Sequence, residues 1–162
     1  MKLEETLRTL SNGGVEFVII GGAAMQVQGS ARLTEDLDFC YRRSKDNIER
    51  LAKAFAPFQP RLRDVPDGLP FRFEAATIER GSNFTLLTDL GQIGFLGHVP
   101  GLGEYQALQN ESETVNLFRL DQKVLSIEGL IKAKKAAARP KDREAIVELE
   151  AMLEYRRKTG IN

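Results

Sequence analysis

The sequence predicts an α+β fold (mixed α/β), in which a mixed, partly antiparallel sheet is flanked by helices and the C-terminus is helical. A β-branched and aromatic run, residues 15–20, is closed by the glycine pair Gly21 and Gly22, and a short apolar segment with helical character follows. Residues 36–42 alternate between apolar and polar side chains, as a half-buried strand does. The last third of the chain has the three-to-four-residue apolar spacing of amphipathic helices.

The other elements are predicted from the same periodicities and from capping and turn residues. The chain has 162 residues, of which 42% are hydrophobic and 28% charged, and we expect a single domain covering residues 1–162. We expect helices at 3–12, 23–28, 44–55, within 104–110, at 126–137 and at 141–158; a strand at 70–75; a hairpin of 83–89 with 92–97; and a last strand at 114–118.

The charge and cysteine content narrow the functional classes. Lys plus Arg and Asp plus Glu both number 23, so the formal net charge is zero and no general field attracts nucleic acid or an anionic membrane. The single cysteine, Cys40, cannot form a disulfide within the chain, and residues 1–10 are too charged for a signal segment. No apolar run approaches the roughly 20 residues that cross a bilayer. We expect a cytoplasmic protein with no membrane partner.

Two carboxylates, Asp36 and Asp38, lie two residues apart in the alternating strand, so their side chains project from the same face. Mg²⁺ prefers hard oxygen ligands and is commonly held by one or two carboxylates together with substrate phosphates. At Gly21 and Gly22 the backbone has no Cβ to keep a phosphate away, and the N–H groups of the following helix point toward that position. The pattern predicts a site for a phosphorylated substrate and a divalent cation.

The segment GGAAMQVQGSARLTEDLDF resembles the signature of the nucleotidyltransferase superfamily, which is a Gly-Gly or Gly-Ser turn, a spacer and an Asp-hydrophobic-Asp strand. With its ending LIKAKKAAARPKDREAIVELEAML, the chain is similar to small bacterial proteins of the abortive-infection toxin (AbiEii-like) type. The resemblance implies a nucleotidyltransferase-like fold, Mg²⁺ or Mn²⁺ at Asp36 and Asp38, and a triphosphate at Gly21 and Gly22. The reaction it implies is transfer of a nucleoside monophosphate from a nucleoside triphosphate to a hydroxyl of an RNA, a small molecule or a protein. A cognate toxin or antitoxin is a candidate partner.

The family usually carries a third acid on a neighbouring strand, between two hydrophobic residues. The similar position in this chain is Gly94, which offers no ligand. Asp89 is our candidate for the third catalytic carboxylate, and Glu74 is the alternative. Asp89 is equally natural as a turn residue within the expected hairpin. If neither acid reaches the metal pair, turnover is expected to be slow or absent.

Five further residues are candidates for nucleotide binding. Lys132, Lys135 and Arg139 fall at i, i+3 and i+7, which would place them on one face of a helix where they could neutralise a triphosphate. Arg32 and Thr34, just before the acids, could contact phosphate or sugar. The competing interpretation of the basic stripe is an ordinary solvated helix face.

Several other functional classes compete with the interpretation of the chain as an enzyme. A catalytically degenerate nucleotide-binding module, which would belong to a toxin-antitoxin system, is the alternative that Gly94 favours. A dinucleotide site lacks its Gly-x-Gly-x-x-Gly pattern, and the only histidine, His98, is too little for a zinc site or a Ser-His-Asp triad. A role through an oligomeric surface ranks last, because no heptad seam is present.

Overall fold

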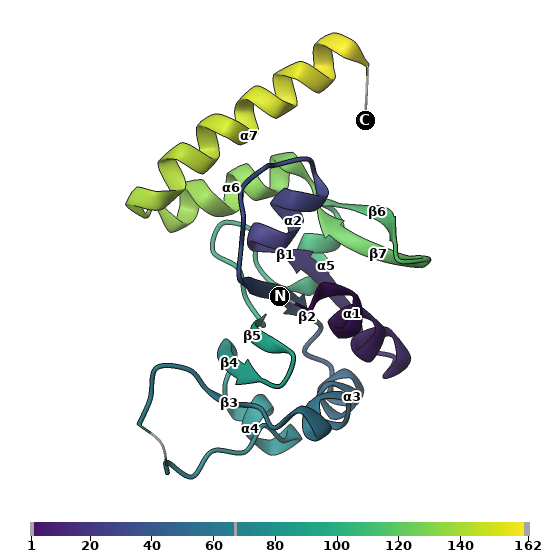
Figure 1. Ribbon diagram of the computed structural model, residues 1–162, viewed down its shortest axis with the longest axis vertical. Helices are drawn as coiled ribbons and strands as arrows, with labels where there is room; N and C mark the ends of the chain where they lie inside the picture. The colour runs from purple at the N-terminus through teal and green to yellow at the C-terminus, as the bar shows by residue number, and fades with distance from the viewer. Residues whose placement is uncertain (1, 67, 161–162) are drawn as a thin grey trace.

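The computed structural model describes residues 2–66 and 68–160, and its centre is a mixed seven-stranded sheet. The strand order is β3-β4-β5-β2-β1-β7-β6, with β2–β5 and β1–β7 parallel and the other pairs antiparallel. The α+β architecture predicted from the sequence is therefore confirmed (Figure 1). The strands are β1 (Phe17–Ile20), β2 (Asp36–Tyr41), β3 (Arg61–Leu62), β4 (Phe84–Thr88), β5 (Gly91–Leu96), β6 (Ser112–Leu117) and β7 (Leu120–Leu125).

Helices cover both ends of this sheet. Helices α6 and α7 lie together at the top of the view in Figure 1, where α6 packs against α2, whereas α3 and α4 lie near the β3–β4 edge. No helix formed by the described residues combines the length and apolar character that a membrane span requires. The helices are α1 (Leu3–Asn12), α2 (Gly21–Val27), α3 (Lys45–Phe55), α4 (Ala75–Arg80), α5 (Tyr105–Gln109), α6 (Ile127–Ala137) and α7 (Pro140–Thr159), with a short 3₁₀ turn at Ala56–Phe58.

An aromatic cluster centred on Phe95 fills one face of the sheet. The Phe95 ring centroid lies 5.0 Å from that of Phe55 on α3, and 5.8 Å from those of Phe39 and Phe73. Phe39 and Phe95 are fully buried. Because strand side chains alternate, burying Phe39 on this face turns its neighbours Asp38 and Cys40 to the other face, as the sequence predicted. The apolar core thus fixes which face carries the acids.

Most local predictions are confirmed. Ser44 and Ser126 are N-caps whose hydroxyls accept from the backbone N–H groups of Asn47 and Gly129, at 3.3 and 3.0 Å. The predicted hairpin forms between β4 and β5. Helix α2 begins at Gly21 itself, two residues earlier than predicted.

The strand predicted at 70–75 is wrong. Residues 70–74 are irregular, and α4 begins at Ala75. The alternation of Phe71 and Phe73 suggested a strand, but Phe73 instead inserts its ring between Phe84 and Phe95. The place beside β4 is taken by the two-residue strand β3, which the sequence analysis missed.

The strand predicted at 114–118 forms as β6, but the prediction that it is the last strand is wrong, because β7 follows and pairs along its whole length with β6. The two strands are joined by Phe118 and Arg119, both with positive φ (54° and 66°). Tight hairpins of this kind are signalled by Asn-Gly or Asp-Gly, and Phe-Arg carries no such signal. The missed strand matters, since β7 pairs with β1 and leads directly into α6.

Removing the ring at the centre of the aromatic cluster should destabilise the whole domain. We expect Phe95→Ala to lower the free energy of unfolding by about 3–5 kcal/mol, because it leaves a cavity among three packed rings. Phe118→Ala is the matched control, since that side chain is 40% exposed, and it should cost less than about 1 kcal/mol. Urea unfolding followed by circular dichroism measures both. Equal losses would show that the cluster is not the core of the fold.

Candidate functional site

The glycine turn and the acidic strand meet because β1 and β2 are antiparallel neighbours. Ile20, the last residue of β1, is paired with Asp38, so Gly21 lies beside the Asp38 carboxylate. A Cβ at Gly21 would lie 2.9 Å from Asp38 Oδ2, and Gly21 has a φ of +62°. Both the space and the backbone conformation therefore require glycine here.

Thr34 connects the second glycine to the first acid. A Cβ at Gly22 would lie 2.8 Å from Thr34 Oγ1, so this glycine allows the loop to approach α2. The Thr34 hydroxyl donates to the carbonyl oxygen of Asp36 at 3.1 Å and accepts from its N–H at 3.3 Å. The structure thus brings Gly21, Gly22, Thr34 and Asp36 together, as the sequence analysis proposed.

On the other side of β2, the parallel strand β5 offers no third carboxylate. Asp36 is paired with Gln92 and Asp38 with Gly94, so these two residues of β5 share the acidic face. A Cβ at Gly94 would lie only 2.2 Å from Asp38 Oδ1. The Asp38 carboxylate thus occupies the space that a side chain at 94 would need.

Arg63, just after β3, reaches this face and was missed from the sequence. Its Nη1 donates to Gln92 Oε1 at 2.6 Å and to Asp36 Oδ2 at 3.3 Å. Only the pairing of β3 with β4 brings Arg63 here, and a two-residue strand has no usable sequence pattern. Asp36 is therefore partly neutralised by a guanidinium in this structure.

The junction between α6 and α7 supplies the other cations, in an arrangement that differs from the predicted stripe. Helix α6 ends at Ala137, and Ala138 takes a left-handed conformation (φ 51°). Arg139 is consequently the N-cap of α7, so Lys132, Lys135 and Arg139 do not share one helix face.

Asp142 holds the cations of this junction in place. The buried Asp142 carboxylate accepts from Arg139 Nε at 2.9 Å and from the Arg139 backbone N–H at 3.0 Å, and it lies 3.5 Å from Lys134 Nζ. These hydrogen bonds from Arg139 lower the pKa of Asp142 to about 2. Neither Lys134 nor Asp142 was singled out from the sequence, although Asp142 at the third position after a helix start is a recognisable capping pattern.

The electrostatics of Asp38 are different. Burial and the neighbouring carboxylate of Asp36 raise the pKa of Asp38, whereas Arg63, Lys141 and Arg139 lower it. Because burial makes the ionised form of a carboxylate costly, a cation placed beside it stabilises that form. Asp38 is therefore suited to bind a cation.

Two hollows meet at Asp38. The first, here called the glycine pocket, has a volume of about 280 Å³ and is lined by Gly21, Gly22, Thr34, Asp36, Asp38 and the cations Arg32, Lys134, Arg139 and Lys141, among others. The second, the apolar pocket, has a volume of about 420 Å³ and lies between the sheet and α6. The two share Gly21, Asp38, Lys134 and Arg139.

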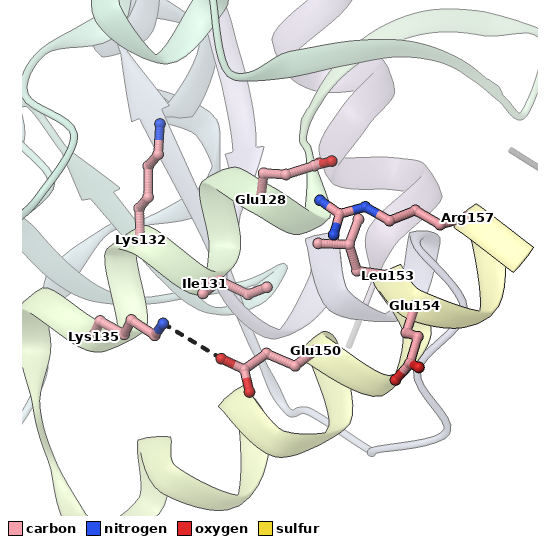
Figure 2. Close-up of a pocket in the computed structure, with 8 residues that line it drawn as sticks. All are labelled: Glu128, Ile131, Lys132, Lys135, Glu150, Leu153, Glu154 and Arg157. Atoms are coloured by element: carbon pink, nitrogen blue, oxygen red, sulfur yellow. Dashed lines mark ion pairs between the residues drawn. The ribbon is translucent and has the colours of Figure 1, made fainter.

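Two of the predicted cations lie away from these pockets. Lys132 and Lys135 line a separate hollow between α6 and α7. Figure 2 shows Lys135 reaching Glu150 of α7, while Lys132 points away from that helix. The Lys135–Glu150 ion pair measures 3.3 Å, and Lys132 forms an ion pair with Glu111. Their role in nucleotide binding remains a prediction without support from their positions.

The remaining candidates are placed as follows. Asp89 lies exposed in the β4–β5 turn, and Glu74 precedes α4 beside a different hollow, so neither lines the glycine pocket or the apolar pocket. Arg32 does line the glycine pocket, but its Nε donates to Glu148 of α7 at 2.6 Å. Arg32 is thus held by α7, and a phosphate would have to compete for it.

The donors present suit a metal that arrives with its substrate. Among residues 2–66 and 68–160, no three His, Cys, Asp or Glu side chains form a metal-ligand cluster. Mg²⁺ is commonly bound through one or two carboxylates plus phosphate oxygens, and Asp36 and Asp38 share one face beside the glycine pocket. The pair therefore fits a Mg²⁺ ion that is also bound by a triphosphate.

The fold that carries this site is similar to that of solved nucleotidyltransferase structures. No protein-family profile matches the sequence, and no curated protein matches it either. Similarity is found instead among solved structures.

The structure is similar to that of LnuA, a lincosamide antibiotic adenylyltransferase solved with lincomycin bound. The TM-score is 0.62, with 14% sequence identity over 93% of this chain and 96% of LnuA. It is also similar to a provisionally assigned nucleotidyltransferase from Thermotoga maritima, with a TM-score of 0.52 and 16% identity over 96% of this chain and 97% of the other. At these identities the likeness establishes the fold, and the abortive-infection subtype stays a prediction.

The Asp142 junction should make stability depend on pH. Because the pKa of Asp142 is lower in the folded than in the unfolded chain, its stabilisation is complete above the ordinary value of 3.8 and is lost as the pH falls toward about 2. We expect Asp142→Asn to lower the free energy of unfolding by about 2 kcal/mol at pH 7, with the difference from wild type narrowing below pH 4. Urea unfolding at pH 7 and thermal unfolding between pH 7 and 3 measure this. Asp121→Asn, at an exposed position of β7, is the control, and a pH-independent difference would contradict the assignment.

Proposed function

We propose that this protein transfers a nucleoside monophosphate from a nucleoside triphosphate to an acceptor hydroxyl, with Mg²⁺ or Mn²⁺ held by Asp36 and Asp38. The observation that carries the proposal is the meeting of Gly21 and Asp38 at the junction of two pockets, one polar and cation-lined and the other apolar. The nucleotidyltransferase fold is consistent with this chemistry.

In the proposed complex the triphosphate lies in the glycine pocket. The absence of Cβ atoms at Gly21 and Gly22 allows phosphate oxygens to approach the backbone, and Lys134, Arg139 and Lys141 neutralise their charge. Asp142 keeps Arg139 pointed at this pocket through two side-chain hydrogen bonds. A bound divalent cation supplies further charge neutralisation of the phosphates.

The reaction forms a bond between the acceptor oxygen and the α-phosphorus and breaks the bond to the β-phosphate, releasing pyrophosphate. The acceptor hydroxyl must also lose its proton. Gln92 and Gly94 provide no base, and among the residues lining the apolar pocket only Asp38 is a carboxylate. The chain thus has the binding and charge-neutralising parts of the site but lacks a dedicated third acid on β5.

Replacing one acid by its amide tests the proposal. We expect Asp38→Asn to weaken Mn²⁺ binding in the presence of a triphosphate at least tenfold and to reduce pyrophosphate release by about 100-fold, since the carboxylate charge is lost while the shape is kept. Electron paramagnetic resonance measures bound Mn²⁺, and a coupled assay measures pyrophosphate with each of the four nucleoside triphosphates. Asp121→Asn is the matched control. Unchanged metal binding and turnover in Asp38→Asn would refute the proposal.

A second candidate function is a catalytically degenerate nucleotide-binding module, and the observation that favours it is Gly94 opposite Asp38. Such a module would bind a triphosphate without turning it over, and on the resemblance to abortive-infection proteins it would partner a toxin or antitoxin. The two functions predict different responses when an acid is placed at position 94.

Gly94→Asp and Gly94→Asn form a matched pair that differs in charge and not in size. Either side chain must displace the Asp38 carboxylate, because a Cβ would lie 2.2 Å from it. If the wild-type chain is an enzyme, both variants should lower pyrophosphate release by about tenfold or more, since Asp38 leaves its position. If the chain is degenerate, the wild type should bind a triphosphate without releasing pyrophosphate, and neither variant should gain turnover, because both displace Asp38. Calorimetric titration with a triphosphate confirms in parallel that each variant still binds.

A further inference from the structure

We propose that the apolar pocket binds the acceptor and that the acceptor is a small, neutral or anionic organic alcohol with an apolar body. This inference rests on the proposed function, because it names the acceptor class for the same site. It also separates a small molecule from the RNA and protein acceptors that the resemblance leaves open.

The size and lining of the pocket point to a small molecule. Its volume of about 420 Å³ lies within the range of pockets that hold single small ligands. Aliphatic side chains form half of its lining, including Ile20, Val99, Leu125 and Leu130, which are all at least 95% buried. Burying an apolar body against such a wall provides binding energy that a polynucleotide backbone cannot gain.

The pocket is also preformed. The loop 99–103 that closes one side is held by two reciprocal backbone hydrogen bonds between Val99 and Gly103, at 2.8 and 2.9 Å. Gly101 allows this loop to pack closely against α6, since a Cβ at this position would lie 2.6 Å from Ala136 Cβ. On the sheet side, Asn83 Oδ1 accepts from Gly97 N at 2.9 Å. Because the pocket is preformed, a ligand that enters it would lose little binding free energy to the ordering of loops or side chains.

The polar groups of the pocket are placed for a hydroxyl. Asp38 lies where the apolar pocket meets the glycine pocket, so a hydroxyl there would be next to the bound triphosphate. Thr85 is paired with Gly94 across β4–β5 and therefore shares the acidic face. Thr85 is exposed and lines the pocket, and among the described residues its hydroxyl has no hydrogen-bond partner, so it can orient an acceptor group.

The charges of the pocket select against cationic and polynucleotide acceptors. Asp38 is its only carboxylate and is the proposed metal ligand, while Lys134 and Arg139 carry positive charge into the same pocket. With Asp38 bound to the metal, the residues lining this pocket leave a cationic acceptor no carboxylate with which to form an ion pair. Single-stranded nucleic acid is usually held by aromatic stacking along a basic groove, and no aromatic residue lines this pocket.

The test fills the apolar pocket and leaves the glycine pocket open. Ala133 lines the apolar pocket and not the glycine pocket, so Ala133→Phe should block the apolar pocket only. Ala151→Phe, at an exposed position of α7, is the matched control. The probes are 4-(hydroxymethyl)benzoate, benzyl alcohol, 4-(aminomethyl)benzyl alcohol and a 12-nucleotide single-stranded RNA. Their binding is measured by calorimetry and ligand-observed NMR on the full chain saturated with a non-hydrolysable triphosphate analogue and Mg²⁺.

We expect the anionic and neutral alcohols to bind wild type and the Ala151→Phe control, and the cationic one to bind several-fold more weakly. In Ala133→Phe their affinity should fall about tenfold or more, while triphosphate affinity changes less than about twofold.

Three outcomes would overturn the inference: no alcohol binding to wild type, alcohol binding that Ala133→Phe leaves intact, or RNA binding that Ala133→Phe abolishes. Loss of triphosphate affinity alone in Ala133→Phe would overturn it too, by assigning the pocket to the nucleoside. A wild-type chain that binds no triphosphate refutes the proposed function instead, and this is read from a separate titration.

Discussion

The site depends on the close contact of Asp38 with two glycines, Gly21 directly after β1 and Gly94 on β5. A Cβ at Gly21 would lie 2.9 Å from Asp38 Oδ2 and one at Gly94 would lie 2.2 Å from Oδ1, so the carboxylate occupies the space that a side chain at either position would need. The aromatic residues on the opposite face of the same strands hold this spacing, because Phe39 and Phe95 are fully buried and stacked. Packing on one face of the sheet therefore sets the position of a partly buried charge on the other.

The cations of the site have a different origin, since they come from the junction of two helices. The left-handed Ala138 ends α6, and Asp142 then draws Arg139 and Lys134 together from the two sides of that break. Lys134 and Arg139 both line the two pockets together with Asp38. The polar half of the site is thus organised by an ion-pair cluster, and the acidic half by apolar packing.

The sequence predicted the acid-bearing half of the site well and the cationic half poorly. Strand alternation placed Asp36 and Asp38 on one face, and the run 15–20 with its glycine pair placed the turn, because both signals are local. Arg63 reaches Asp36, and Lys134 reaches the two pockets, only through tertiary packing, so no local pattern indicates them. The stripe of Lys132, Lys135 and Arg139 failed because Ala138 has good helical propensity yet ends the helix. Likewise β7 was missed because its turn, Phe118-Arg119, lacks the residues typical of such a conformation.

The contacts of α7 with the segment between α2 and β2 have a consequence for synthesis of the chain. Glu148 accepts from the Ser30 hydroxyl and from Arg32, and Arg156 donates to the backbone carbonyl of Gln28 at 2.7 Å. These partners are separated by more than a hundred residues, so they can meet only after α7 has been synthesised. A nascent chain that ends before α7 therefore has its acidic strand but lacks the contacts that hold the loop leading into that strand. The glycine pocket becomes complete only after α7 has left the ribosome.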